Sequence, residues 1–270
     1  MAESQAEVLA LDFDGVISDS VVESFVVAGR TLARLDPGAA AARAALELEG
    51  GDAAAVRSHP LYGDFLDLMP LGNRAEDFGV ALRLLEQGRA PIEQPEFDAF
   101  REELGPDFLQ KFHRVFYEER AALRSAGLGG WLALLEPFEP FVELLRRRAE
   151  DRILTVATAK DRASIELLLD AYGIAELFPG ERIVDKEAGR SKRAHLGLLG
   201  RRLGVAYAQI TFIDDKLNHL EDVAGLGVRC ALAGWGYNGP RERQRAARQG
   251  FLVCDLASAE EDLFGAPAGV

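Results

Sequence analysis

VLALDFDGVISDS, residues 8–20, joins an apolar run to two carboxylates that stand one residue apart. The run from Val8 to Leu11 has the composition of a buried strand, and Asp12 and Asp14 follow where that strand would end. At a strand end the chain can bend, so both carboxylates can face one small volume. Gly15 then permits a turn that a side chain would obstruct. The stretch predicts a strand that leads into an active site, against the alternative of a surface turn rich in Asp and Gly.

The two carboxylates suggest a particular chemistry. A site that holds both of them ionised needs a cation, and hard oxygen ligands suit Mg²⁺. One carboxylate can then attack a phosphoryl group while the other moves protons, which is a route to an aspartyl-phosphate intermediate. The pattern therefore indicates phosphoryl transfer with Asp12 and Asp14 at its centre.

Composition restricts the class of protein. The chain has 270 residues, 48% of them hydrophobic, which is enough for one large or two modest domains. A net charge of -13 makes nucleic acid an unfavourable partner, and no apolar run reaches membrane-spanning length. Two cysteines and a start without a basic segment favour a cytoplasmic protein without disulfide bonds or a secretory signal.

Helical periodicity dominates residues 21–136, where acidic residues outnumber basic ones. A helix is expected from Ser20 to Leu35, and Asn73 with Glu76 resembles the capping box of another that reaches about Gln87. Further helices are expected around Leu46 and Leu48, over 96–104 and over 107–125, with a connector over 91–95. The region is interpreted as an inserted helical domain.

Strands and helices alternate after residue 137, which predicts a parallel sheet covered on both faces. The expected strands are 153–157, 182–184, 210–213, 228–232 and 251–254, and the expected helices are 138–148, 162–171, 191–203, 217–224 and 240–249. The strand at Val8 belongs to the same sheet. The predicted fold is α/β, a Rossmann-like doubly wound sheet of residues 1–20 and 137–270, with a helical domain of residues 21–136 inserted.

Polar residues follow several of these strands, and ligands collect at the carboxyl ends of parallel strands. Thr158 offers a hydroxyl and a nearby amide for a phosphoryl oxygen, although a threonine there is often only a helix cap. Lys186 and Lys192 can each supply the ammonium that offsets phosphoryl charge, and Lys192 is favoured because it follows a helix cap. Asp214 and Asp215 can complete a metal site.

The motifs in this order resemble those of the haloacid-dehalogenase (HAD) superfamily. Residues 8–20 match its first motif, h-h-h-D-x-D-G-V-h-x-D-S, in the form typical of the phosphoglycolate-phosphatase-like branch. VATAK, around Thr158, resembles the second motif, and Lys192 fits the third better than Lys186 does. ITFIDDKLNHL resembles the fourth, and ALAGWGYNG resembles a segment that follows it in that branch, although its aromatic residues can simply be packing.

The resemblance implies roles for these residues. Asp12 would be the nucleophile and Asp14 the general acid and base. Thr158, Ala159 and Lys192 would bind the phosphoryl group, with Lys160 as a neighbour. Mg²⁺ would be held by Asp12, the carbonyl of Asp14, and Asp215 or Asp214.

The fourth motif departs from the commonest family form. Asp214 stands where Gly is usual, and His219 takes the place of the last acid. It is therefore open which of the two aspartates binds the metal directly, and Asp215 is favoured. His219 is either a donor to that pair or an ordinary helix residue.

The inserted domain has the location of a C1 cap, which closes over the site and selects the substrate. Arg74 is the first candidate for a contact with an anionic substrate, ahead of Arg120 and Arg124. The expected function is Mg²⁺-dependent hydrolysis of a small phosphorylated metabolite.

Four alternatives remain. A haloacid dehalogenase typically lacks the acid at Asp14, and a phosphonatase needs a cap lysine nearer the first motif than Lys111. A sugar-phosphate mutase shares the core motifs. A catalytically silent binding protein would explain Asp214 and His219. The physiological substrate and the oligomeric state are not predicted.

Overall fold

The computed structural model describes residues 7–40, 52–72, 74–189 and 191–265. The chain divides into two compact units, one formed by residues 1–19 with 137–270 and the other by residues 20–136. The predicted boundaries differ from these by one position, because Ser20 was assigned to the sheet domain. Two short strands, β2 (Ser18–Asp19) and β3 (Glu136–Pro137), pair where the chain passes from one unit to the other.

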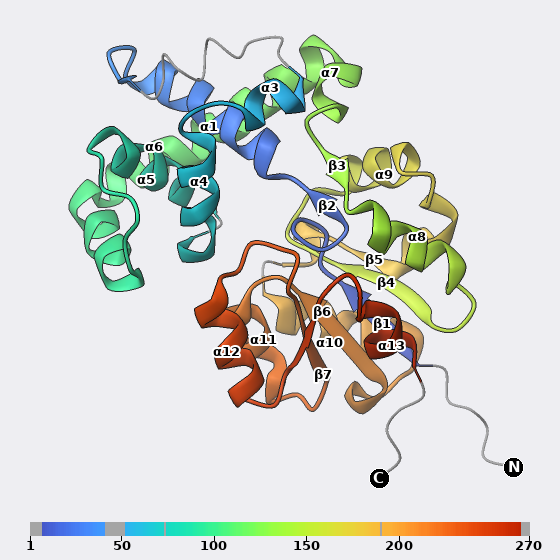
Figure 1. Ribbon diagram of the computed structural model, residues 1–270. Helices are drawn as coiled ribbons and strands as arrows, with labels where there is room; N and C mark the ends of the chain where they lie inside the picture. Colours follow the sequence, from blue (N-terminus) through green and yellow to red (C-terminus); the bar gives the residue numbers. More distant parts are fainter. Residues whose placement is uncertain (1–6, 41–51, 73, 190, 266–270) are drawn as a thin grey trace, which may run out of the picture. The chain divides into compact units, whose positions relative to one another are not determined.

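A six-stranded sheet forms the centre of the first unit, in the order β5-β4-β1-β6-β7-β8, and every adjacent pair is parallel (Figure 1). Numbered along the chain, these strands stand in the order 3-2-1-4-5-6, which is that of a Rossmann-like doubly wound sheet. The predicted α/β fold is confirmed. The strands are β1 (Val8–Leu11), β4 (Ile153–Ala157), β5 (Ile183–Val184), β6 (Ile210–Asp214), β7 (Arg229–Ala233) and β8 (Leu252–Cys254).

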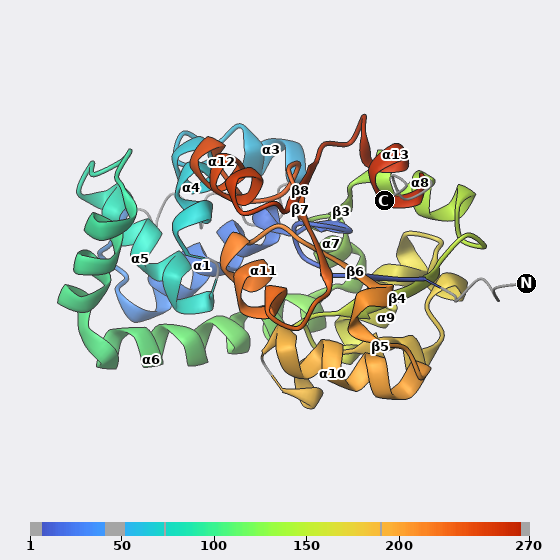
Figure 2. The same cartoon turned by 90° about the horizontal axis from the view of Figure 1, so that it is seen from below.

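Helices cover both faces of this sheet, because alternate residues of each strand point to opposite sides. Val8 and Ala10 of β1 join one core cluster with apolar residues of α10, α11 and α12. Figure 2 shows α10 on one side of the sheet and α8 with α13 on the other. The helices are α8 (Glu139–Arg147), α9 (Arg162–Ala171), α10 (Lys192–Leu203), α11 (Leu217–Ala224), α12 (Pro240–Arg248) and α13 (Ala259–Phe264).

The longer elements described in the second unit are all helices. These are α1 (Val21–Leu35), α3 (Ala53–Arg57), α4 (Tyr62–Leu68), α5 (Ala75–Glu86), α6 (Gln94–Ala126) and α7 (Leu128–Leu132), with a 3₁₀ turn at Met69–Leu71. Aromatic rings build much of its core, and Phe25, Phe65 and Phe78 follow one another with centroids 5.1 and 6.0 Å apart. No helix among residues 7–40, 52–72, 74–189 and 191–265 is both long and apolar enough to cross a membrane.

A buried ion pair also stabilises this unit. The Glu23 carboxylate, fully buried on α1, accepts two hydrogen bonds from Arg120 of α6, at 2.7 and 2.6 Å. The Trp131 indole of α7 donates a third at 3.2 Å. The guanidinium of Arg120 is thus committed to Glu23, which makes it a poorer substrate contact than the sequence suggested.

Several helix boundaries differ from the predicted ones. Residues 96–104 and 107–125 were correctly separated, because Gly105 interrupts α6 with φ 76° and Pro106 follows it. The connector over 91–95 was too long, since α6 begins at Gln94. The helix predicted around Leu46 and Leu48 lies outside the described residues, as does Asn73. At the start of α5, the Asp77 carboxylate accepts the N–H of Arg74 at 3.1 Å, one position later than the predicted box.

Candidate active site

Three adjacent strands end at one edge of the sheet, and each carries a predicted site residue there. β1 lies between β4 and β6, and Leu11 is paired with Val156 on one side and Ile213 on the other. Asp12 follows β1, Thr158 follows β4, and Asp214 ends β6 directly before Asp215. The register therefore brings the predicted carboxylates and the threonine to one edge, as expected for parallel strands.

Asp12 is held at this edge by backbone and side-chain bonds. Its N–H donates to the carbonyl of Ile213 at 2.9 Å, which extends the pairing of β1 with β6. Its Oδ1 accepts the N–H of Phe13 at 2.7 Å and lies 2.7 Å from the Nζ of Lys192. Within the described part of the chain, no protein donor reaches Oδ2. Burial raises the pKa of the Asp12 carboxyl, although the charge of Lys192 opposes that rise.

Lys192 is the ammonium of this edge. It is the first residue of α10, whose cap is Ser191 with its Oγ accepting the N–H of Ala194 at 3.1 Å. The Lys192 side chain is only 4% exposed, and its Nζ lies 2.7 Å from Asp12, 3.1 Å from Asp214 and 2.9 Å from the carbonyl oxygen of Ala157. Burial would lower the Lys192 pKa, but Asp12 and Asp214 outweigh burial and raise it. Lys186, the alternative, is exposed beyond β5.

Asp214 is fully buried, and both oxygens of its carboxylate have hydrogen-bonding or charged partners. Its Oδ1 accepts the N–H of Lys216 at 2.8 Å, its Oδ2 lies 3.1 Å from Lys192, and the Nδ1 of His219 is 3.1 Å from both oxygens. Burial would raise the Asp214 pKa, but His219 and Lys192 outweigh burial and lower it. His219 lies in the first turn of α11 and is therefore a partner of Asp214, not merely a helix residue. Because its own pKa is raised by Asp214 against burial, it is suited to carry a proton there.

Asp215 has the opposite environment. Its Oδ2 accepts the N–H of Tyr237 at 2.9 Å, whereas its Oδ1 accepts no hydrogen bond from the described residues. Burial, together with the charges of Asp214 and Asp12, raises the pKa of Asp215 to about 7. A nearby cation would relieve that unfavourable charge.

Asp14 lies directly before the turn in which Gly15 has φ 81°. The Asp14 side chain is 36% exposed, and its Oδ1 accepts a hydrogen bond from the Nζ of Lys160 at 2.9 Å. Lys160 itself is buried, and its N–H donates to the Oγ1 of Thr158 at 3.3 Å. From the sequence, Lys160 was expected only as a neighbour of Thr158, whereas in the structure it also donates a hydrogen bond to Asp14. Its spacing from Thr158 was the available signal.

A phosphoryl-sized anion would find donors beside Thr158. The Thr158 hydroxyl oxygen accepts from Lys160, which leaves its proton free to donate elsewhere. Ala159 is exposed, and among the residues with described positions none accepts its N–H. The structure thus places Thr158 and Ala159 together at the edge that also holds Asp12 and Lys192.

The donor set can be tested for Mg²⁺. Asp12, Asp214 and His219 offer atoms within 4.8 Å of one another, but the Lys192 ammonium already lies between the first two. Oδ1 of Asp215 is a carboxylate oxygen that no described donor reaches, and the Asp12 carboxylate lies at the same edge of the sheet. These are hard ligands of the kind that Mg²⁺ prefers. The residues therefore fit a divalent cation by the chemistry of their donor atoms.

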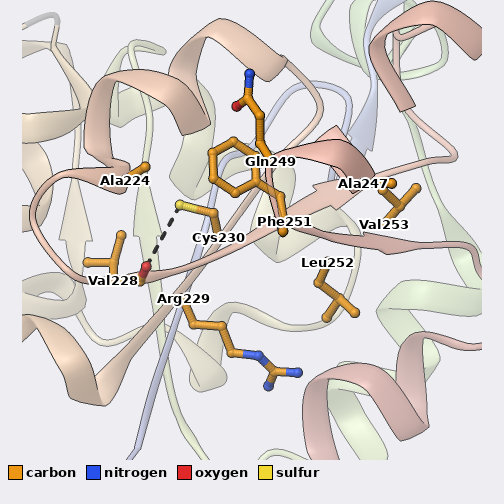
Figure 3. A pocket seen from close by; sticks show the side chains of 10 residues that line it. Ala224, Val228, Arg229, Cys230, Ala247, Gln249, Phe251, Leu252 and Val253 are labelled. Atoms are coloured by element: carbon orange, nitrogen blue, oxygen red, sulfur yellow. Dashed lines mark hydrogen bonds between the residues drawn. The ribbon is translucent and has the colours of Figure 1, made fainter. Parts of the chain in front are cut away.

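Two further features belong to other parts of the described chain. Arg74 is exposed at the start of α5 in the helical unit, and its contact with a substrate stays a prediction. A hollow of about 680 Å³ lies near the amino ends of β7 and β8, where Val228, Cys230 and Phe251 line it (Figure 3). Burial raises the pKa of the Cys230 thiol to about 11, so this thiol is a poor nucleophile.

Comparison with known proteins rests on structure alone, because no protein-family model and no curated protein sequence matches the chain. A provisionally named phosphoglycolate phosphatase from Lactobacillus delbrueckii subsp. bulgaricus superposes with a TM-score of 0.68 at 13% identity, over 97% of this chain and 99% of its own. A haloacid dehalogenase-like hydrolase from Streptococcus pneumoniae gives 0.61 at 13% identity, over 95% and 98%.

A HAD family hydrolase from Deinococcus radiodurans R1, solved with bound phosphate and sodium, gives a TM-score of 0.54 at 18% identity, over 97% of this chain and 96% of its own. Identities this low establish the fold and not the activity. The chain has the fold of HAD-like hydrolases, including those named as phosphoglycolate phosphatases, as the motifs predicted.

Proposed function

We propose that this protein is a Mg²⁺-dependent HAD-type phosphatase that hydrolyses a small phosphate monoester through an aspartyl-phosphate intermediate. The observation that carries the proposal is the state of Asp12. One oxygen of its buried carboxylate is anchored 2.7 Å from the Lys192 ammonium, and the other is free of protein donors within the described residues. A carboxylate so oriented is suited to attack phosphorus. The names of the structural neighbours support the same reaction class.

In the first step, Oδ2 of Asp12 attacks phosphorus and the bond from phosphorus to the ester oxygen breaks. The departing alkoxide takes a proton from Asp14, which must therefore be protonated when it acts. Asp14 has the exposure needed to reach a leaving group, and Lys160 holds one of its oxygens. The products of this step are an alcohol and a phosphorylated Asp12.

In the second step, Asp14, now ionised, takes a proton from water, and the resulting hydroxide attacks the phosphorus of the aspartyl phosphate. The bond between phosphorus and Oδ2 breaks, which releases phosphate and restores Asp12. In this proposal Thr158, the Ala159 amide and Lys192 bind the phosphoryl oxygens in both steps, which is supported by the 2.7 Å distance from the Lys192 Nζ to Asp12. Mg²⁺, held by Asp12, the Asp14 carbonyl and Asp215, would supply the charge that lets an anion approach this carboxylate-rich edge.

Lys192 has a second role in this scheme. Because Lys192 and His219 satisfy Asp214, that aspartate is proposed to anchor the lysine, which leaves Asp215 as the direct metal ligand. Asp214 and His219, the two departures from the family motif, are thus proposed to act together in holding Lys192 in place.

The proposal is tested with Asp12→Asn on a generic aryl phosphate, with Mg²⁺ and with a chelator. The variant should lose at least about 10³-fold in rate, as removal of a nucleophile does. Asp170→Asn is the matched control, since Asp170 is exposed on α9 and the variant should keep wild-type activity. Substantial Mg²⁺-dependent hydrolysis by Asp12→Asn would refute the mechanism.

A panel of phosphorylated metabolites, with Arg74→Ala beside the wild type, tests the predicted substrate contact. Hexose phosphates belong in this panel because a mutase would return an isomer and no free phosphate.

A further inference from the structure

The segment Gly234–Asn238 connects the end of β7 to the cap of α12, and we call it the strap. Its sequence, GWGYN, belongs to the stretch that resembles the segment after the fourth motif, and the proposed reaction does not use its aromatic residues. Residues of the strap contact both Asp215 and the chain Val16–Asp19 that follows the first motif.

Asp215 is enclosed by the strap on one side and by the first motif on the other. A Cβ built on Gly236 would lie 2.3 Å from the Cβ of Asp215 and 2.4 Å from the carbonyl oxygen of Gly15. A Cβ on Gly15 would lie 2.5 Å from the Cγ of Asp215. Neither glycine can therefore carry a side chain without displacing Asp215 or the backbone against it.

Polar bonds complete this enclosure. The Tyr237 N–H donates to Oδ2 of Asp215 at 2.9 Å, and the Asn238 side-chain amide donates to the backbone carbonyl of Asp215 at 3.1 Å. The Tyr237 carbonyl accepts the Nζ of Lys216 at 2.8 Å. The strap thus occupies one oxygen of the Asp215 carboxylate and leaves the other one open.

The same strap is bonded to the chain that leaves the first motif. The Tyr237 hydroxyl donates to Oδ1 of Asp19 at 2.8 Å, and the Trp235 indole donates to the carbonyl of Val16 at 3.1 Å. Trp235 also packs on Phe141 of α8, with ring centroids 4.8 Å apart. The strap therefore joins the ends of β1 and β6 from outside the sheet.

From these contacts we infer that Gly236 and Tyr237 are positioning residues that orient the Asp215 carboxylate for a divalent cation. Gly236 allows the strap to lie against Asp215, and Tyr237 fixes one carboxylate oxygen through its N–H while its hydroxyl anchors the strap to Asp19. The inference rests on the proposed function, because it takes Asp215 as a metal ligand. It adds that the orientation of this ligand depends on a segment that binds neither metal nor phosphate.

The test measures Mg²⁺ binding by calorimetry without substrate, and thermal unfolding without metal. Gly236→Ala should weaken Mg²⁺ binding by about 10–100-fold, the range found when groups that orient metal ligands are removed. Tyr237→Phe keeps the backbone bond to Asp215 but loses the bond to Asp19, and should weaken binding by roughly 3- to 10-fold.

Two matched controls separate positioning from general stability. Gly225→Ala makes the same substitution at a glycine with no atom within 4 Å of the added Cβ. Tyr172→Phe removes a hydroxyl contact of 2.7 Å with Ser18, in the same segment as Asp19 but away from the strap. Both controls should bind Mg²⁺ within about twofold of the wild type.

The inference is overturned if Gly236→Ala binds Mg²⁺ as the wild type does, or if its melting temperature falls while the affinity is unchanged. Should Gly236→Ala not fold, Tyr237→Phe decides, and wild-type affinity in that variant overturns the inference. Because binding is measured without turnover, a protein whose Mg²⁺ affinity depends on the strap but which hydrolyses no phosphate ester would refute the proposed function alone.

Discussion

Replacement of Lys192 by methionine tests the centre of the site most directly. Methionine keeps an unbranched side chain of similar length but removes the ammonium from between Asp12 and Asp214, at 2.7 and 3.1 Å. At an effective dielectric constant of about 20, each of these contacts corresponds to roughly 5–6 kcal/mol of Coulomb attraction before desolvation. Because the wild-type lysine is only 4% exposed, most of that attraction is unscreened.

Two consequences can be estimated. Breaking a buried ion pair costs about 3–5 kcal/mol of stability, and the two pairs here share one lysine, so a similar total is expected. The rate constant kcat/KM should fall by about 10²–10³, because Lys192 is proposed to face the transferring phosphoryl group. The stability loss of about 3–5 kcal/mol is a large part of the free energy of unfolding of an ordinary domain.

The stability loss should depend on pH with a definite sign. Burial already raises the folded-state pKa of Asp12 against the charge of Lys192, so without Lys192 it rises further, and this carboxyl binds more protons in the folded than in the unfolded state. Stability then falls as pH rises above the unfolded value of about 3.9. Lys192→Met should therefore be closest to the wild type near pH 4–5 and most destabilised above pH 7.

Urea unfolding at several pH values and steady-state kinetics on an aryl phosphate measure both effects. Lys186→Met is the matched control, because Lys186 is exposed beyond β5. This variant should change stability by less than about 0.5 kcal/mol and kcat/KM by less than about twofold. The reasoning is refuted if Lys192→Met keeps a third or more of wild-type kcat/KM, or if the large loss appears in Lys186→Met instead.

Three further predictions concern other parts of the molecule. Burial and the charges of Asp214 and Asp12 raise the pKa of Asp215 to about 7, so Mg²⁺ must displace a proton from this carboxyl at acid pH. Mg²⁺ affinity should therefore fall as the pH drops below 7. Calorimetry in buffers of different ionisation enthalpy should detect the released proton. Glu23→Gln should cost about 3–5 kcal/mol in urea unfolding because it removes the buried carboxylate charge that pairs with the Arg120 guanidinium, whereas Glu118→Gln, with 40% of the side chain exposed, should cost under about 1 kcal/mol. Lys160→Gln should slow alkyl phosphates by about tenfold or more, but aryl phosphates much less, because an aryl leaving group needs no proton from Asp14; equal losses on both would contradict the assigned role of the pair.

The strand ends of the sheet could be predicted from sequence because each follows a local pattern. An apolar run followed by a polar residue identifies β1, β4 and β6, and Ser191 with Gly204 brackets α10 by its cap and by a left-handed φ of 68°. Parallel strand ends then had to meet at one edge. Short helices such as α3 and α4 were not predicted, because a few residues carry too little periodicity and their packing decides their conformation.

The pairing of side chains at that edge could not be predicted in the same way. Nothing in the order of residues says that Lys192 lies between Asp12 and Asp214 and not beside Asp215, since that depends on where α10 packs against β4. The contacts of Lys160 with Asp14 and of Tyr237 with Asp19 join residues far apart in the chain. Sequence patterns identify the residue types and the strand ends, whereas distance and burial distinguish an anchored carboxylate from a free one.

The order of the sheet also has a consequence for biosynthesis. Of the six strands of this sheet, β1 leaves the ribosome first, yet its two neighbours are β4 and β6, and Val8 pairs with Ile153 and Ile210. At about 5–20 residues per second, the apolar strand VLAL must wait roughly 7–30 s for its first partner. The helical unit is contiguous in sequence and can complete its own contacts during that interval. We therefore expect the nascent chain to pass through a stage in which the helical unit is folded while the strand that carries the nucleophile is still unpaired, and hence available to chaperones.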